Sequence, residues 1–245
     1  MFYKLVKNMI NSFLSIFNLK LNKITLSNNF YYYIVRTLIH YKIDLVLDVG
    51  ANTGQFSEKI INFGYGKKII SFEPMSKAYK ELCLKSKGYE NWEIHDRIGI
   101  GKKKETKILN ISKNSVSSSV LEIKKIYLEQ EPNLRFIKKE KINLISLNEL
   151  LKKKKFKNKR IFLKIDTQGY EKEIIKGASK VLNRLHCIML ETSITPMYKG
   201  EESYTKIIEF MKKKGFYVWA IERGFSNKKT GRVNQLDVIF VNKNV

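Results

Sequence analysis

An apolar run that ends in an aspartate and leads into two glycines is the feature of this chain that most limits its fold. Residues 45–49 read Leu-Val-Leu-Asp-Val, and Gly50 and Gly54 follow before a segment with helical spacing begins. By this pattern a buried parallel strand passes into a loop that lets a nucleotide-like ligand approach the backbone. Glycine permits a positive φ and close contact without a Cβ. Asn52, between the glycines, is of a type that tolerates the left-handed region.

A second apolar run, 68–72, is followed by Glu73 and Pro74, and Glu73 lies 25 residues after Asp48. One strand–helix–strand unit has about this span, and an acidic side chain at its end accepts hydrogen bonds from ribose hydroxyls. The glycines do not have the G-x-G-x-x-G spacing of a pyrophosphate loop, and the chain contains no G-K-[ST] sequence of a P-loop. Acidic strand ends suit a cationic ligand with a ribose and no phosphate, so we expect S-adenosylmethionine as the cofactor.

Strand and helix patterns alternate from Ile43 onward, which is typical of a parallel sheet in an α/β fold. Residues 99–159 are longer than a simple strand–helix connection, and their alternating stretches predict an inserted hairpin or extra strands over the sheet edge. We expect an N-terminal helical extension over residues 1–40 and one domain over 41–245. The predicted strands are 44–49, 68–73, 92–98, 160–166, 186–192, 216–222 and 235–242, and the predicted helices are 54–63, 76–87, 170–182 and 203–214.

The chain resembles the FkbM-type methyltransferases, a branch of the class I S-adenosylmethionine-dependent enzymes. Five segments carry the resemblance over roughly residues 43–242: DVGANTGQFS (48–57), SFEP (71–74), LKIDTQGYEKEIIKGA (163–178), LETS (190–193) and QLDVIFV (235–241). The resemblance implies a doubly wound, Rossmann-like sheet of seven strands, mostly parallel with an antiparallel last strand. It also implies O-methylation of hydroxyls on sugars or polyketides.

The cofactor residues follow from the strand ends. We expect Asp48 to orient the amino-acid part of the cofactor and Glu73 to bind its ribose. Asp96 and Arg97, at the end of the third predicted strand, are candidates for the adenine edge. The full predicted cofactor set is Asp48, Gly50, Asn52, Gly54, Glu73, Pro74, Asp96 and Arg97.

Asp166 and Glu191 are the candidate catalytic residues, because each carboxylate ends an apolar strand at the same edge of the predicted sheet. Asp166 is the first candidate for the general base or substrate anchor and Glu191 the second. The alternative is that both bind a divalent cation that activates the acceptor hydroxyl. Asp237, in the last strand, is either a buried, paired carboxylate or a second acid of the site.

Three further side chains are candidate acceptor contacts. Ser117 and Ser118 lie in a polar run that the family pattern places near the acceptor, and Tyr198 follows the fifth predicted strand. Residues 166–169 read Asp-Thr-Gln-Gly, without the Pro-Pro-aromatic sequence usual in methyltransferases that act on the amino groups of bases. N-methylation of nucleic-acid bases is therefore disfavoured.

The formal net charge of +24 raises the question of nucleic-acid binding. The chain has 40 lysines and only 7 arginines, whereas recognition of bases and phosphates favours arginine. A solvated basic surface is the better interpretation, and such a surface would still attract anionic lipid or polysaccharide. We expect Cys83 and Cys187 to be reduced thiols of a cytoplasmic protein.

The N-terminal segment has apolar residues at helical spacing between Leu5 and Phe17, interrupted by polar residues. The run is too broken for a transmembrane span. We expect a helix that packs on the domain or on a second subunit. The alternative is a basic amphipathic helix, within residues 1–24, that lies on the inner face of the membrane.

The sequence therefore predicts a cytoplasmic O-methyltransferase that uses S-adenosylmethionine and acts on a sugar hydroxyl of a bacterial surface glycan or glycolipid. Two alternatives stay open. The first is an RNA-directed methyltransferase, which the charge of +24 suggests. The second is a non-catalytic scaffold or membrane adaptor that retains the fold, although Asp48, Gly50, Gly54 and Glu73 speak against it.

Overall fold

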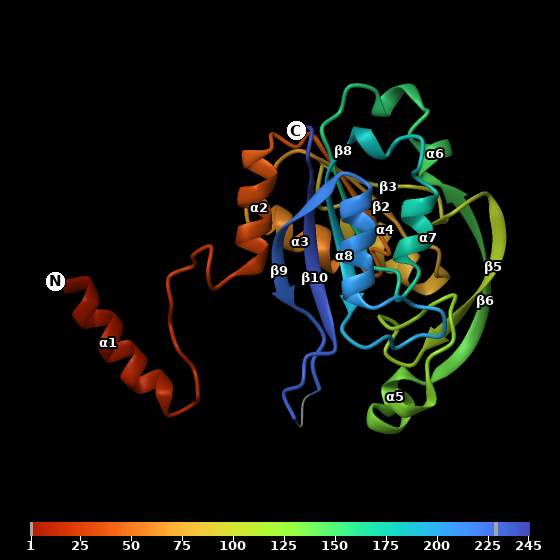
Figure 1. Cartoon of the computed structure of the whole chain (residues 1–245). Helices are drawn as coiled ribbons and strands as arrows, with labels where there is room; N and C mark the ends of the chain where they lie inside the picture. Colours follow the sequence, from red (N-terminus) through yellow and green to blue (C-terminus); the bar gives the residue numbers. More distant parts are fainter. Residues whose placement is uncertain (1, 228–229) are drawn as a thin grey trace.

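The structure, a computed structural model, describes residues 2–227 and 230–245. Figure 1 shows the arrangement of its helices and strands. The α-helices are α1 (Phe2–Ser15), α2 (Phe30–His40), α3 (Gln55–Asn62), α4 (Ser76–Ser86), α5 (Lys125–Gln130), α6 (Leu147–Leu150), α7 (Glu171–Lys176) and α8 (Tyr204–Lys213). The strands are β1 (Leu45–Val49), β2 (Lys68–Phe72), β3 (Trp92–Ile94), β4 (Gly99–Gly101), β5 (Glu105–Ser112), β6 (Phe136–Ser146), β7 (Ile161–Ile165), β8 (Leu185–Ser193), β9 (Phe216–Arg223) and β10 (Gln235–Asn242).

The main sheet has seven strands in the order β3-β2-β1-β7-β8-β10-β9. Strands β3, β2, β1, β7 and β8 pair in parallel, and β10 pairs antiparallel with both β8 and β9. The predicted doubly wound sheet with an antiparallel last strand is thus confirmed. The strand order reverses between β1 and β7, and ligands of open α/β sheets bind at the carboxyl ends of the strands beside such a reversal.

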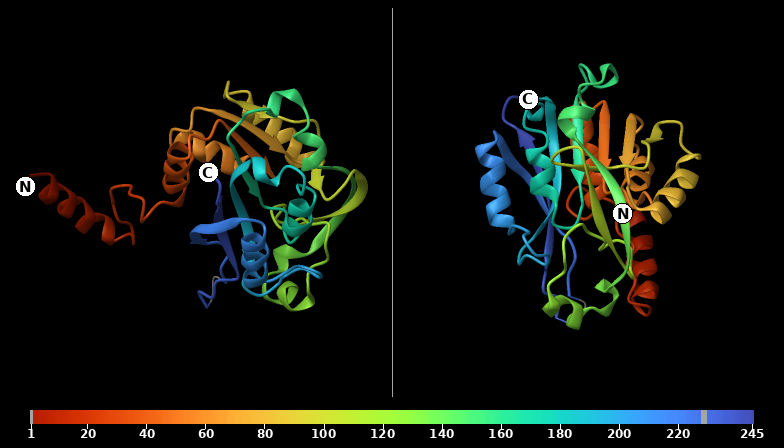
Figure 2. Two further views of the ribbon diagram at one scale, coloured as in Figure 1. Left: turned by 45° about the horizontal axis from the view of Figure 1, so that its top comes forward. Right: turned by 90° about the vertical axis from the view of Figure 1, so that its right-hand side faces the viewer.

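Two apolar layers cover the faces of this sheet (Figure 2). On one face α2 and α3 pack through Ile34, Leu38 and Ile60, all fully buried. On the other face α6, α7 and α8 pack together with the smaller sheet. Because β1 and β7 are covered on both faces, their residues are buried throughout, and both strands read as continuous apolar runs with one charged exception each.

The insertion forms a separate three-stranded sheet in the order β4-β6-β5. Leu109, Ile142 and Leu144 from this sheet belong to the same apolar core as the main sheet. Extra strands were predicted, and they are present. The predicted strand 92–98 is too long, because β3 ends at Ile94 and the chain then crosses into the second sheet at Gly99.

The helix predicted over 170–182 is also too long, because α7 ends at Lys176. Gly177 follows, and a Cβ there would lie 2.3 Å from the carbonyl oxygen of Gly101. This glycine therefore permits close packing of the α7 terminus on β4. Helix α6 begins with a capping box, in which Ser146 and Glu149 bond each other's backbone N–H.

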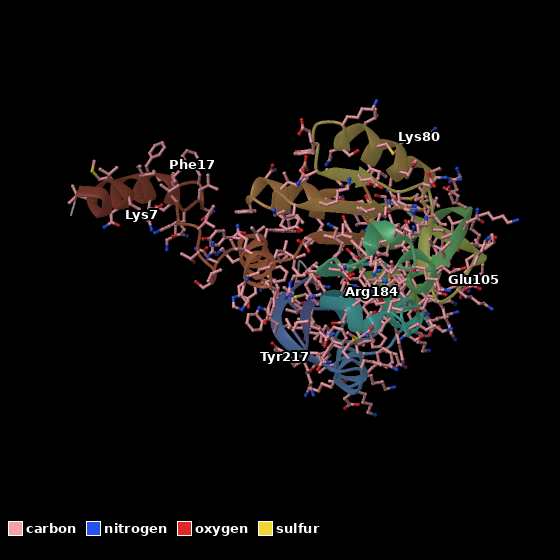
Figure 3. The ribbon with its side chains drawn as sticks, turned by 90° about the horizontal axis from the view of Figure 1, so that it is seen from above. Lys7, Phe17, Lys80, Glu105, Arg184 and Tyr217 are labelled. Atoms are coloured by element: carbon pink, nitrogen blue, oxygen red, sulfur yellow. The ribbon has the colours of Figure 1, made fainter. Side chains whose placement is uncertain are left out.

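The N-terminal 40 residues divide into two parts. Helix α2 lies in the core on the main sheet, whereas α1 stands apart from the domain (Figures 1 and 3). The prediction that the first helix packs on the domain is therefore wrong for α1, whose apolar side chains are exposed. Among the described residues, no helix is long and apolar enough to cross a membrane.

Candidate active site

A cavity of about 390 Å³ opens at the carboxyl ends of β1, β2, β7 and β8, beside the strand reversal. Its volume is in the range of small-ligand sites. The main sheet supplies polar side chains to its wall, and the second sheet supplies apolar ones. The residues that line it include Tyr31, Gly50, Asn52, Glu73, Pro74, Met75, Leu109, Ser118, Ile142, Leu144, Lys164, Asp166, Gln168, Glu191 and Asp237.

The loop after β1 has the conformation that its glycines predict. Gly50 has φ +73°, and a Cβ on it would lie 1.9 Å from the carbonyl oxygen of Asp166. Asn52 has φ +49°, in the left-handed region. Its backbone N–H donates a 2.7 Å hydrogen bond to Glu73 Oε2. The loop between β1 and α3 is thereby fastened to the end of β2.

Glu73 is a buried carboxylate on the cavity wall. Its second oxygen, Oε1, accepts a 2.8 Å hydrogen bond from the N–H of Met75. Burial raises the pKa of Glu73 to about 7, although these two backbone hydrogen bonds and the charge of Lys164 favour its ionised form. A carboxylate fixed at both oxygens and still open to the cavity can accept hydrogen bonds from ligand hydroxyls.

Asp48, which the sequence predicts to orient the amino-acid part of the cofactor, does not line the cavity. Its carboxylate is fully buried below the loop, 3.1 Å from Lys164 Nζ and 2.8 Å from Ser57 Oγ. Lys164 Nζ also donates to the carbonyl oxygen of Gly50 at 3.2 Å. Asp48 therefore holds Lys164, and Lys164 in turn holds the loop at Gly50.

Gln168 joins the two candidate catalytic carboxylates. Its Nε2 donates to Asp166 Oδ1 at 2.9 Å and to Glu191 Oε2. Both acceptors are carboxylates, so the amide nitrogen must face them and the amide oxygen must face away. That oxygen accepts a 2.8 Å hydrogen bond from the hydroxyl of Tyr198. Gln168 has φ +57°, so an unusual backbone conformation places its side chain between the two acids.

Three carboxylates and one ammonium share this end of the cavity. Asp237 lies opposite Glu191 in the β8–β10 register, and Lys164 Nζ lies 3.6 Å from Asp166 Oδ2. Burial and the negative charge of Asp166 raise the pKa of Asp237 to about 7 and that of Glu191 well above its usual range. Burial lowers the pKa of Lys164, but the charges of Asp48 and Asp166 more than offset this and raise it. The site therefore combines a fixed cation with acids that readily hold a proton.

The other predicted residues divide between the cavity and the layers behind it. Pro74 and Ser118 line the cavity. Gly54 does not, and it is needed for packing, since a Cβ there would lie 2.4 Å from the ring of Trp92. Arg97 pairs with Glu140 outside the cavity, and its neighbour Asp96 does not line the cavity either.

Ser117 and Tyr198 lie behind the wall. Tyr198 is fully buried, and its hydroxyl lies 3.0 Å from the carbonyl oxygen of Ser117. Burial raises the pKa of Tyr198 well above its usual range, so the hydroxyl stays a donor. Tyr198 does not line the cavity, and its hydroxyl holds Gln168, so its contact with an acceptor stays a prediction.

The divalent cation predicted as an alternative has no support. In residues 2–227 and 230–245 no group of three or more His, Cys, Asp or Glu side chains is arranged to hold a metal ion. Between Asp166 and Glu191, where the ion was expected, lies the amide of Gln168. Cys83 and Cys187 are free thiols in this structure, and burial raises the pKa of Cys187 to about 12.

Sequence reasoning missed Lys164 and Gln168. The lysine had a detectable signal, because a charged residue in the apolar run Ile161–Ile165 must be paired if the strand is buried on both faces. Gln168 had none, since its role depends on a left-handed turn and on the distance between β7 and β8. Tyr31 and Met75, which also line the cavity, were likewise not predicted.

The family described as the methyltransferase FkbM domain matches residues 48–218. None of the curated proteins compared matches the chain. Among solved structures, the magnesium protoporphyrin IX methyltransferase ChlM from Synechocystis PCC 6803 with bound SAM is 10% identical, with a TM-score of 0.48 and coverage of 98% of this chain and 96% of that one.

Two further solved structures have similar scores. The 1,6-didemethyltoxoflavin-N1-methyltransferase from Burkholderia thailandensis with bound S-adenosylhomocysteine is 8% identical, with a TM-score of 0.47 and coverage of 86% of this chain and 76% of that one. An rRNA methylase from Streptococcus thermophilus is 10% identical, with a TM-score of 0.43 and coverage of 90% and 99%. The match over residues 48–218 spans most of the chain, which therefore belongs to the FkbM methyltransferases, a family of class I S-adenosylmethionine-dependent enzymes.

Proposed function

We propose that this protein transfers a methyl group from S-adenosylmethionine to a hydroxyl of a sugar, in a bacterial surface glycan or glycolipid. The observation that carries the proposal is the pair of carboxylates, Asp166 and Glu191, that Gln168 holds side by side on the cavity wall. Methylation of a hydroxyl requires that its proton be removed, and a positioned carboxylate can accept it.

The residues at the other end of the cavity fit the cofactor. Glu73 offers the ribose hydroxyls a carboxylate fixed by Asn52 and Met75, and Gly50 leaves the backbone of the loop accessible. Leu109, Ile142 and Leu144 give an apolar wall suited to an adenine ring. When bound, S-adenosylmethionine supplies an electrophilic methyl group on a positively charged sulfur.

Asp166 is the first candidate for the proton acceptor. Gln168 occupies its Oδ1, and Oδ2 is directed toward the side of Lys164. Its side chain is 35% exposed, so an acceptor hydroxyl can reach it from the cavity. Glu191 is the second candidate, because it lines the same wall beside Asp166.

Charge favours a neutral acceptor over RNA. Asp166, Glu191 and Asp237 line the same part of the cavity, and carboxylates there repel phosphate groups. A sugar hydroxyl brings no charge into this environment and offers neighbouring hydroxyls for hydrogen bonds. The net charge of +24 keeps RNA as the outcome that would contradict this proposal.

The test is transfer of a labelled methyl group. The protein, with S-adenosylmethionine labelled in its methyl group, is incubated separately with glycolipid, polysaccharide and RNA fractions of bacterial cells. We expect label in a glycan fraction, recovered after acid hydrolysis as an O-methyl sugar. The matched control is Asp166→Asn, which should retain binding of S-adenosylhomocysteine. Label recovered in RNA, or as an N-methyl group, would contradict the proposal.

A further inference from the structure

Helix α1 has an apolar face that no part of the described chain covers. Leu5, Met9 and Phe13, which share that face at i, i+4 and i+8, are 62%, 67% and 64% exposed. The linker after α1 continues the pattern, since Ile16, Phe17 and other apolar side chains of it are exposed as well. Exposed apolar residues that lie next to one another mark a surface that binds another protein or a membrane.

The same segment is strictly basic. Residues 1–43 contain no aspartate or glutamate, and Asp44 is the first acid of the chain. Lys7 lies across the helix from the apolar face, next to Asn8 and Asn11, and Lys20 and Lys23 lie in the linker. Figure 3 shows Lys7 and Phe17 on this segment, away from the domain. An apolar face backed by lysines is typical of a helix that lies in the interface of an anionic bilayer.

Charge distinguishes a bilayer from a second copy of the chain. The protein has a net charge of +24, so a second copy would bring like charges against Lys7, Lys20 and Lys23. An anionic bilayer supplies the opposite charge and an apolar layer together. The 14 residues of α1 are too few to span that layer, so the helix would lie parallel to it.

The linker connects α1 to a helix that reaches the edge of the cavity. The linker ends at α2, and Tyr31, in the first turn of α2, lines the cavity. The ammonium of Lys59, in α3, lies 4.4 Å from the centre of the Tyr31 ring. This contact holds the start of α2 against α3. The linker, residues 16–29, therefore connects α1 to the edge of the cavity.

We propose that α1 and the linker that follows it, residues 2–29, anchor the protein to anionic membranes and so bring the cavity to acceptors carried on lipid. The inference that this segment binds membranes depends only on α1 and its linker. The inference that the acceptor is carried on lipid rests on the proposed function. The occupant of the apolar face is the boundary between the head groups and acyl chains of the bilayer. The lysines contact the lipid phosphates.

The test is sedimentation of the full chain with vesicles of phosphatidylcholine containing phosphatidylglycerol, compared with phosphatidylcholine alone. We expect binding to the anionic vesicles that weakens as salt is raised. Met9→Ser with Phe13→Ser should weaken it by at least about tenfold, because two buried apolar side chains are lost. Lys20→Glu with Lys23→Glu should weaken it by about fivefold or more per lysine.

Matched controls use residues of the same type on the second sheet and α5. Ile126→Ser with Ile137→Ser removes two apolar side chains that are 57% and 66% exposed. Lys138→Glu with Lys139→Glu makes the same change of charge on β6. Both control variants should bind the anionic vesicles as the unchanged protein does.

The proposal is overturned if the control variants lose as much binding as the α1 variants, because general charge would then explain it. It is also overturned if the unchanged protein does not bind the vesicles. If light scattering then shows that the unchanged protein is a dimer and that Met9→Ser with Phe13→Ser is a monomer, the apolar face binds a second copy of the chain. Binding of S-adenosylhomocysteine, measured in solution without vesicles, separates this outcome from a failure of the proposed enzyme function.

Discussion

The two ends of the cavity use their carboxylates in opposite ways. At the cofactor end, Asp48 and Glu73 each have fixed partners, which are Lys164 and two serine hydroxyls for one and two backbone N–H groups for the other. At the other end, Glu191 lies among acids, and its Oε2 accepts hydrogen bonds from the amides of Gln168, which it shares with Asp166, and of Gln235. The first arrangement fixes each carboxylate through bonds to the loop and strand ends, and the second places several acids next to one another.

Lys164 joins the two ends. It is 5% exposed, and its ammonium lies within 4 Å of both Asp48 and Asp166. One residue thus neutralises the buried acid below the loop and sets the charge next to the candidate base. The difference between the two ends can be tested by changing one acid at a time and measuring binding, stability and turnover separately.

The largest expected effect is on turnover. Asp166→Asn keeps the shape of the side chain and an oxygen for Gln168, but removes the proton acceptor. We expect kcat to fall by about 10²- to 10⁴-fold, the usual contribution of a general base. The affinity for S-adenosylhomocysteine, measured by calorimetry, should not change. Kinetics are measured on the glycan fraction identified by methyl labelling.

The matched control for this variant is Asp237→Asn, two strands away on the same cavity wall. It removes a negative charge from the same region without removing the first candidate base. Its kcat should stay within about tenfold of the unchanged protein. Equal losses in the two variants would mean that the total charge matters and Asp166 has no special role.

The next largest effect is on folding. Lys164→Met leaves the carboxylate of Asp48 buried without its cation, so we expect the free energy of unfolding to fall by about 3–5 kcal/mol. Urea denaturation measures it. Adding Asp48→Asn to this variant should recover part of the loss. Lys139→Met, at an exposed position, should change stability by less than about 0.5 kcal/mol. No recovery in the double variant would mean that Lys164 stabilises the fold through contacts other than Asp48.

The contrast between the two ends also explains what the sequence could predict. The acids at the strand ends could be predicted because an acid that ends an apolar run is recognisable in the sequence alone. They are Asp48, Glu73, Asp166 and Glu191. Which of them faces the ligand was not visible. Asp48 turned out to be buried because Lys164, four strand positions into β7, lies beside it in the β1–β7 register.

The wall of the cavity depended on longer-range packing. Arg97 was predicted near adenine, but its partner Glu140 comes from β6, 43 residues later in the chain. Leu109, Ile142 and Leu144 reach the cavity only because the second sheet folds onto the face of the main sheet. The segment 99–159 predicted extra strands over the sheet edge, whereas the second sheet packs on the face of the main sheet.

A smaller effect is expected on the pH dependence of cofactor binding. Burial holds the pKa of Glu73 at about 7 in the free protein. Hydroxyls that donate to its carboxylate favour the ionised form, so binding lowers this pKa and releases a proton. The affinity for S-adenosylhomocysteine should therefore rise about three- to tenfold between about pH 6 and pH 8, and then level off.

Glu73→Gln separates this carboxylate from Asp237 and Glu191, whose raised pKa values also affect the cavity. The variant should lose about 1–3 kcal/mol of binding free energy at high pH, because ligand hydroxyls lose a charged acceptor. Its affinity should vary less with pH than that of the unchanged protein. Identical pH profiles, recorded by calorimetry, would remove Glu73 from the ribose site.

The smallest effect tests how the catalytic end is positioned. Tyr198→Phe removes the hydroxyl that bonds Gln168 Oε1 and leaves the rest of the buried ring in place. One lost hydrogen bond costs about 1 kcal/mol, and a less well-held Gln168 should lower kcat about three- to tenfold while KM stays the same. Tyr127→Phe is the matched control, because its hydroxyl bonds the carbonyl oxygen of Thr195, outside the cavity. It should lose similar stability and keep its kcat. If both variants keep full activity, then Gln168 holds its two carboxylates without help from Tyr198, and the left-handed turn at residue 168 alone sets the geometry of the acids.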